Sequence, residues 1–182
     1  LLVHRDIKPA NLMICAKLGG DHDVVKVLDF GIVALREPAP VDEALTGQGV
    51  FNGTLAFMSP EALRDERPLD GRTDLYALGC VALWLLTGEP LFRARSAAAM
   101  IAAHLRQVPR RPSEVVDEEG PTAVDEVVAA CLSKELDERP ANARELARRL
   151  AAAVDPALWT HSEAAAWWAS EVGADEAPES VP

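Results

Sequence analysis

Acidic, amide and basic side chains with the chemistry of a phosphate site lie within the first thirty residues. The segment HRDIKPAN at residues 4–11 contains Asp6, Lys8 and Asn11, and the triplet DFG at residues 29–31 begins with Asp29. Carboxylate and amide oxygens are hard ligands that suit Mg²⁺. A lysine ammonium is a compact positive charge that can meet an anionic phosphoryl group. Phosphoryl transfer needs such groups, because negative charge spreads over the moving group in its transition state.

Three short strings follow one another in a fixed order along the chain. HRDIKPAN at 4–11 precedes DFG at 29–31, with a strand-forming run before it, and SPE follows at 59–61. Together they resemble the catalytic loop, the metal-binding triplet and the end of the activation segment of protein kinases. The resemblance covers roughly residues 1–154. It implies ATP and Mg²⁺ as cofactors and a protein as the second substrate.

The resemblance also implies roles for the individual residues. Asp6 is placed as the group that accepts or orients the proton of the substrate hydroxyl. Lys8 is placed beside the transferred phosphoryl group, where it also contacts the nucleotide. Asn11 and Asp29 are placed as ligands of Mg²⁺ and, through the metal, of the nucleotide.

The residues near the catalytic string indicate the substrate class. A lysine two residues after the catalytic aspartate, here Lys8, is similar to serine/threonine kinases. Thr54 agrees, because in that family this threonine bonds the catalytic aspartate and lysine and shapes the floor for a small hydroxyl substrate. Phe57 and Ser59 replace the more usual tyrosine and alanine, which are mild departures.

Arg5 bears on how the activity is regulated. Kinases with an arginine before the catalytic aspartate often order their activation loop when a phosphothreonine pairs with it. Between Gly31 and Gly53 the one hydroxyl-bearing residue is Thr46. Thr46 is therefore the predicted regulatory phosphorylation site, and an unmodified loop residue is the alternative.

Four other residues of the resemblance are predicted to be structural. His4 is expected to pack beneath the phenylalanine of the DFG triplet rather than to act as a base. Asp74 is expected to bind backbone amides of the catalytic loop. Glu61 and Arg139 resemble a buried ion pair that joins the SPE segment to the helical body, and loss of one partner would strand a charge.

The elements that position these residues can be predicted from hydrophobic periodicity and turn residues. Short strands are expected at 12–15 and 24–28, separated by a turn at 19–21, and a long loop at 36–53. Helices follow: one buried on all sides from 73–74 to 86, then others at 97–105, from 122, and from a cap at 142 to 154. The predicted fold is mainly α: a protein-kinase-like C-terminal lobe, in which a short β-hairpin carries the active-site loops on a helical bundle, with the N-terminal lobe absent.

Two segments lie outside that chemistry. Residues 155–182 form an acidic tail with no Lys or Arg, expected to be partly disordered. Its Trp159, Trp167 and Trp168 predict either a short helix that folds back on the body or a partner-binding segment. The basic group from His104 to Arg111 is expected to be a solvated loop between helices, with a docking patch as the alternative.

Composition excludes several functional classes. With 29 acidic and 18 basic residues the formal charge is −11, which argues against binding to nucleic acid. Three widely spaced cysteines predict no disulfide framework and a reducing, cytoplasmic compartment. The longest apolar run, Leu75 to Leu86, is too short to cross a bilayer, and no signal peptide is evident.

The upper-lobe residues with which the family binds the nucleotide are missing from this sequence. It contains no G-x-G-x-x-G loop, and no lysine and glutamate of the upper lobe. We therefore expect an active kinase of which this chain is a fragment, itself transferring little phosphate. An inactive docking module and a truncated gene remnant are the alternatives. The uncovered apolar surface is expected to favour self-association.

Overall fold

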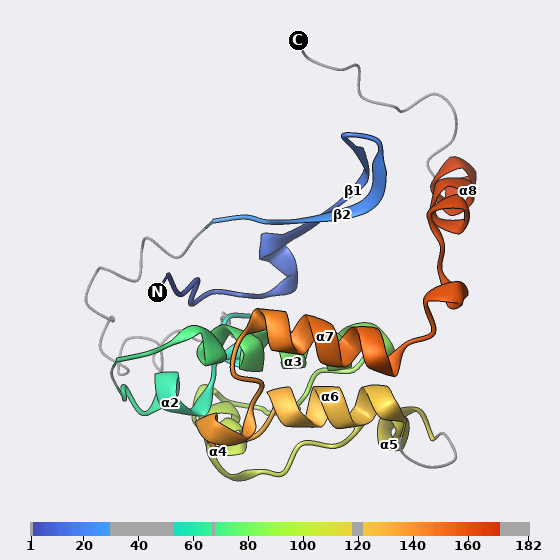
Figure 1. Cartoon of the computed structure of the whole chain (residues 1–182). Helices are drawn as coiled ribbons and strands as arrows, with labels where there is room; N and C mark the ends of the chain where they lie inside the picture. Colours follow the sequence, from blue (N-terminus) through green and yellow to red (C-terminus); the bar gives the residue numbers. More distant parts are fainter. Residues whose placement is uncertain (1, 30–52, 67, 118–121, 172–182) are drawn as a thin grey trace.

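A computed structural model describes residues 2–29, 53–66, 68–117 and 122–171. Within these ranges the chain forms one β-hairpin and seven α-helices (Figure 1), so it is mainly α as predicted. The helices are α2 (Pro60–Leu63), α3 (Gly71–Thr87), α4 (Ala97–Arg106), α5 (Pro112–Val116), α6 (Ala123–Cys131), α7 (Ala143–Ala153) and α8 (His161–Glu171). Short 3₁₀ turns lie at η1 (Pro9–Asn11), η3 (Leu55–Phe57), η4 (Leu136–Glu138) and η5 (Pro156–Leu158).

The hairpin consists of β1 (Leu12–Leu18) and β2 (Asp21–Val27), which pair antiparallel from Leu12 opposite Val27 to Leu18 opposite Asp21. Gly19 and Gly20 form the turn with φ of +63° and +102°, a region that glycine adopts without a steric cost. Both strands are longer than the sequence predicts. In Figure 1 the hairpin lies to one side of the helical body, with η1 between them.

Helix α3 is the centre of the helical body. It begins two residues before the predicted start, because the Asp70 side chain accepts a hydrogen bond from the Arg72 N–H at 2.8 Å and caps the helix. It ends at Gly88, whose φ of +72° is the left-handed conformation that terminates many helices. Asn142 caps α7 as predicted, and Ser96 and Thr122 cap α4 and α6; each side chain accepts from the backbone N–H three residues on.

The core forms where α3 meets α6 and α7. Tyr76, Cys80 and Leu83 of α3 pack with Val128 of α6 and with Leu132, which directly follows that helix. A second cluster joins the other side of α3 to α6 and α7: Leu75, Val127, Cys131 and Leu146. Burial of each large aliphatic side chain stabilises the fold by about 1.5–3 kcal/mol.

Gly79 lets α3 and α6 approach closely. A Cβ at this position would lie 2.8 Å from the Cβ of Cys131 and 3.1 Å from two side-chain carbons of Leu132. Such a separation is shorter than ordinary van der Waals contact, so a glycine is required at this crossing.

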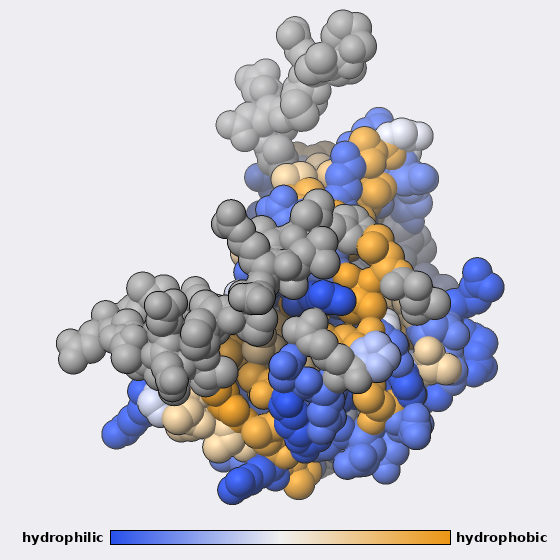
Figure 2. Space-filling view, turned by 90° about the vertical axis from the view of Figure 1, so that its left-hand side faces the viewer, coloured by the Kyte–Doolittle hydropathy of each residue, from blue (hydrophilic) through white to orange (hydrophobic). Residues whose placement is uncertain are grey.

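The prediction that α3 is buried on all sides is wrong for its last turn. Trp84, Leu85 and Leu86 are 41%, 67% and 50% exposed. In the part of the chain that the structure describes, no element covers this side. Apolar residues also reach the surface elsewhere, as the face in Figure 2 shows, where they lie between hydrophilic ones. No helix among the described residues is long and apolar enough to cross a membrane.

The predicted solvated position of His104 is also wrong. This residue lies on α4 and is fully buried, with its Nδ1 2.9 Å from the Tyr76 hydroxyl and its ring edge-on to Phe92 at 5.1 Å. Burial lowers the pKa of His104 to about 4, and the charge of Lys134 acts in the same direction. A neutral imidazole can be buried in an aromatic pocket without a charged partner, whereas Arg106 and Arg110, which follow it, are exposed.

Candidate active site

The carboxylate of Asp74 fixes the start of the HRDIKPAN segment. Asp74 lies in the first turn of α3, and its two oxygens accept from the backbone N–H of His4 at 2.7 Å and of Arg5 at 2.8 Å. This is the contact that the sequence predicts for Asp74. Because Arg5 adopts a φ of +68°, which is unfavourable for a residue with a Cβ, these two bonds hold a strained backbone in place.

His4 joins this segment to the residue that precedes Asp29. Its ring is buried, and Nε2 lies 2.9 Å from the carbonyl oxygen of Leu28. The Leu28 N–H in turn donates to the carbonyl of Asn11 at 2.8 Å. His4 is therefore buried and bonds the backbone of Leu28, while Phe30, the neighbour predicted for it, lies outside the described residues.

Asp6, Lys8 and Asn11 form one polar cluster. The Lys8 ammonium lies 2.8 Å from Oδ2 of Asp6. The Asn11 amide nitrogen donates to the same Oδ2 at 2.9 Å and to the Asp6 carbonyl at 2.7 Å. The other oxygen, Oδ1, is inaccessible to solvent and has no hydrogen-bond partner among the described residues. One side of the carboxylate is thus fixed, and the other has an unused acceptor.

Thr54 reaches this cluster from a distant part of the sequence. Its hydroxyl accepts from the Lys8 ammonium at 3.0 Å. The predicted bond to lysine is present, while Asp6 is bound by Lys8 and Asn11 rather than by Thr54. Thr54 directly precedes η3, which packs against α3 and α4. The helical body therefore positions the threonine, and Lys8 connects it to Asp6.

Asn11 and Asp29 lie at the two open ends of the hairpin. Asn11 is buried and uses its amide nitrogen to bond Asp6, whereas Asp29 is exposed with a φ of +50°. In the described ranges no three His, Cys, Asp or Glu side chains gather into a cluster that could hold a metal. An amide and one carboxylate nevertheless fit Mg²⁺, which usually takes one or two protein ligands together with water and substrate phosphates.

Glu61 and Arg139 form the predicted buried ion pair. Both guanidinium NH groups donate to the carboxylate, at 2.8 Å each, and both residues are 3% exposed. Burial alone would raise the pKa of Glu61, but the hydrogen bond and charge of Arg139 outweigh it and lower the pKa below its usual value. The pair ties α2, which begins directly after Ser59, to the segment before α7.

Two neighbours of this pair were not singled out in the sequence. The Thr73 hydroxyl donates to Glu61 at 2.9 Å, and the Tyr76 ring lies 4.9 Å from the Arg139 guanidinium carbon. Each lies within two residues of Asp74 on α3. Their position beside Asp74 is the sequence signal that could have identified them.

The predicted regulatory residues are only partly described. Arg5 is exposed beside the Asp6 cluster. Thr46 lies outside the described residues, so the structure does not place it relative to Arg5.

Comparisons with known proteins agree on one family. The model of the protein kinase domain matches residues 1–150. A probable serine/threonine-protein kinase of Corynebacterium efficiens is 40% identical over 152 residues, covering 82% of this chain and 22% of that protein. Serine/threonine-protein kinase PknJ of Mycobacterium tuberculosis is 38% identical and covers 94% of this chain and 31% of its own length. PknB of Mycolicibacterium smegmatis is 39% identical, covering 80% and 22%. The chain thus spans between about a fifth and a third of these relatives.

Proposed function

The chain belongs to the protein kinase family, and we propose that it transfers the γ-phosphoryl group of ATP to serine or threonine hydroxyls of a protein substrate. In this proposal residues 1–154 form the C-terminal lobe of a kinase domain, and residues 155–182 form a tail that follows it. The relatives are bacterial serine/threonine-protein kinases, which supports the hydroxyl class of the substrate.

The observation that carries the proposal is the set of hydrogen-bond partners of the Asp6 carboxylate. Lys8 and Asn11 hold Oδ2, while Oδ1 has no partner within the described part of the chain. Oδ1 is covered, but the Asp6 side chain as a whole is 29% exposed, so a substrate hydroxyl can donate its proton to the accessible part of the carboxylate and be oriented for attack on the γ-phosphorus. The Lys8 ammonium, already beside Asp6 and Thr54, supplies positive charge for the phosphoryl oxygens.

Asn11 and Asp29 are the proposed ligands of Mg²⁺. When bound, Mg²⁺ neutralises phosphate charge and aligns the phosphates of ATP. Asn11 is held by Asp6, and the backbone before Asp29 is held by His4. The sequence has no G-x-G-x-x-G loop, so we propose that firm nucleotide binding requires residues outside these 182.

We also propose that phosphorylation of Thr46 regulates the enzyme through Arg5. Arg5 is exposed, and its backbone is fixed by Asp74, so its guanidinium is available to a phosphate without rearrangement of the loop. Mass spectrometry after incubation with ATP tests this. Phosphate on Thr46, with activity that falls in Thr46→Ala and in Arg5→Ala, is the expected result.

Two further proposals concern the compartment and the association state. Cys15, Cys80 and Cys131 are free thiols, and we propose a reducing, cytoplasmic setting for this region. Ile14 and its cross-strand partner Val25 share one face of the hairpin and are each 56% exposed, which supports association of this face with another apolar surface.

The test is phosphoryl transfer from labelled ATP to serine, threonine and tyrosine peptides, by the chain extended with the coding sequence that precedes Leu1. We expect transfer to serine and threonine peptides. Asp6→Asn should lower kcat by about 10²–10⁴-fold, the contribution typical of a general base. Asp117→Asn, at an exposed position far from Asp6 in the sequence, is the matched control. An extended protein that binds peptide but transfers no phosphate would favour the inactive docking module.

A further inference from the structure

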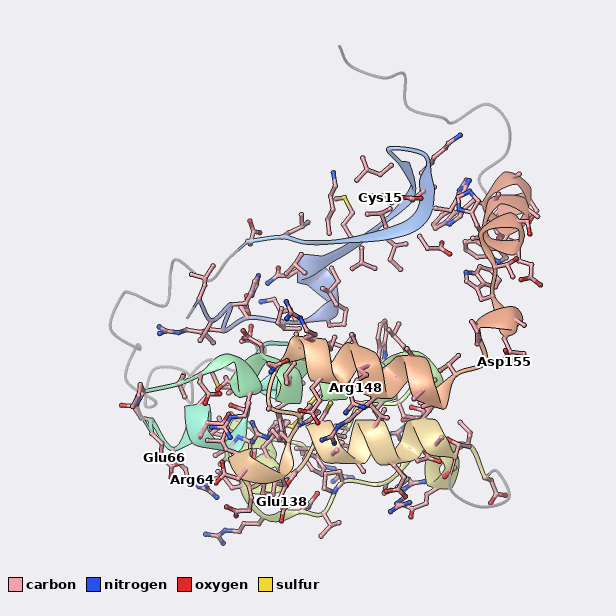
Figure 3. The ribbon with its side chains drawn as sticks, viewed as in Figure 1. Cys15, Arg64, Glu66, Glu138, Arg148 and Asp155 are labelled. Atoms are coloured by element: carbon pink, nitrogen blue, oxygen red, sulfur yellow. The ribbon has the colours of Figure 1, made fainter. Side chains whose placement is uncertain are left out.

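The tail after α7 folds back onto the β-hairpin. The chain leaves α7, passes η5 and forms α8 alongside β2, and side chains fill the space between α8 and the hairpin (Figure 3). The Trp159 indole N–H donates to Oδ2 of Asp23 at 2.6 Å, and the Trp168 indole N–H donates to Oδ1 at 2.5 Å. One carboxylate of β2 therefore binds two tryptophans that lie 136 and 145 residues away.

Asp23 occupies an irregular point of the strand. The paired positions pass from Cys15 opposite Val24 to Lys17 opposite His22, with no pair at Asp23. Asp23 has a φ of +56°, a conformation that aspartate and asparagine tolerate better than most residues. Next to it the rings of His22 and His161 meet edge-on at 5.0 Å. The contact therefore involves several side chains around a locally distorted backbone.

The donors to Asp23 are uncharged indoles, in a tail that contains no Lys or Arg. No Lys or Arg follows Arg149, so this segment has no permanent cation with which to bind an aspartate. Indole N–H groups are donors without charge, and two of them satisfy both oxygens of Asp23. These bonds lower the pKa of Asp23, Trp159 having the larger effect and Trp168 the next. The contact thus favours the ionised carboxylate.

The hairpin has little other support in the described structure. An isolated two-stranded hairpin is marginally stable in water and gains stability by packing against a helix. Among the described elements, α8 and η1 make the main contacts with the two strands. The open ends of the same hairpin adjoin Asn11 and Asp29, and the Leu28–Asn11 backbone bond connects them.

We propose that residues 156–171 act as a brace, in which Trp159 and Trp168 clamp Asp23 and thereby hold the hairpin that positions Asn11 and Asp29. Asp23, Trp159 and Trp168 are positioning residues, because none of them contacts the Asp6 cluster in the described structure. The docking of the tail stands independently of catalysis. Its effect on the metal ligands rests on the proposed kinase function.

The first test is amide hydrogen exchange of the chain and two variants. Asp23→Asn keeps the shape and tolerates the positive φ, but loses the charge and one of the two acceptors. Trp168→Phe keeps an aromatic ring and loses the donor. In both, we expect amides of residues 12–27 to exchange about 5–20-fold faster, with α3 and α6 unchanged.

Trp167→Phe is the matched control. Trp167 is 45% exposed and meets the Trp168 ring edge to face at 4.7 Å, so this variant changes a neighbouring tryptophan and keeps both bonds to Asp23. It should leave exchange of residues 12–27 within twofold of the unmodified chain. Unchanged exchange in both Asp23→Asn and Trp168→Phe would overturn the brace.

The second test measures the metal requirement of the extended protein used for the transfer assay. In Asp23→Asn, the Mg²⁺ concentration for half-maximal transfer should rise several-fold, with the KM for the peptide unchanged. Faster exchange with an unaltered Mg²⁺ requirement would overturn the positioning role. An extended wild-type protein that transfers no phosphate would count against the proposed function, and the exchange experiment would still decide whether the tail docks.

Discussion

Removal of one partner of the Glu61–Arg139 pair should destabilise the chain severely. Both residues are 3% exposed, and two bonds of 2.8 Å join them. Arg139 also donates to the carbonyls of Ser133 at 2.8 Å and of Arg72 at 3.0 Å. In Glu61→Leu the guanidinium is left in the interior without its counter-charge, at a cost of about 3–5 kcal/mol. Domains of this size unfold with about 5–15 kcal/mol, so the loss is a large fraction of the total.

The comparison with Arg139→Met and with the double variant separates charge burial from packing. Each single variant strands one buried charge, whereas the double variant strands none and has apolar groups of similar volume. The double variant should therefore cost clearly less than the sum of the two single variants. Urea unfolding followed by circular dichroism at pH 7 measures all four proteins. Single variants that each cost less than about 1 kcal/mol, or strictly additive losses, would refute the reasoning.

The same pair predicts the pH dependence of stability. Burial opposes ionisation of Glu61, but the bonds from Arg139 win and its folded pKa is lower than its ordinary value of 4.5. The contribution of Glu61 is then fully present above pH 4.5 and is lost as the pH falls through the folded pKa. The chain should lose more stability than the double variant between pH 5 and pH 3. Equal losses in this interval would contradict the assignment.

Three further predictions concern packing and burial in the helical body and the hairpin. Gly79→Ala should destabilise by about 1–3 kcal/mol through overpacking between α3 and α6, as measured by urea unfolding; a loss within 0.5 kcal/mol, the range of ordinary surface substitutions, would show that the helices separate easily. His104 has a folded pKa of about 4 against an ordinary 6.5, so the unfolded chain binds more protons between these pH values. The free energy of unfolding should therefore rise from pH 4 to pH 6.5, by up to about 3 kcal/mol. His104→Gln should remove this rise, and an unaltered rise would show that other groups cause it. A thiol reagent at neutral pH should modify Cys15 first, because burial raises the pKa of Cys80 and raises that of Cys131 to about 11. Mass spectrometry of the native chain measures the labelling, and Cys80 labelled as fast as Cys15 would contradict this prediction.

The sequence predicted best those contacts that a motif fixes in both partners. The contacts of Asp74 with the backbone amides of His4 and Arg5, and of Glu61 with Arg139, were implied by the resemblance to protein kinases. They are present over separations of 69 to 78 residues. The mainly α architecture followed in the same way, from apolar periodicity and capping residues.

Contacts that depend on which faces meet could not be predicted. Nothing near Asp23 in the sequence indicates that two indoles bind it, because Trp159 and Trp168 lie 136 and 145 residues away. The burial of His104 depends on the aromatic pocket formed by Tyr76 and Phe92. Its neighbours in sequence are basic, and local composition therefore predicted a solvated segment. The prediction of burial for the last turn of α3 was wrong for the reverse reason. An apolar run indicates burial but does not indicate which element covers it.

The geometry of the candidate site depends on residues that do not themselves carry the chemistry. Arg5 and Asp29 both adopt the left-handed backbone region, with φ of +68° and +50°, where an L-residue costs about 1–2 kcal/mol. On one side the Asp74 carboxylate binds the strained amide of Arg5 and its neighbour; on the other, His4 binds the carbonyl of Leu28, directly before Asp29. His4 takes part in both contacts, its N–H bonding Asp74 and its ring bonding Leu28. One histidine therefore couples the backbone around Asp6 to the backbone around Asp29, and a change at His4 should disturb the proposed base and the proposed metal ligand together.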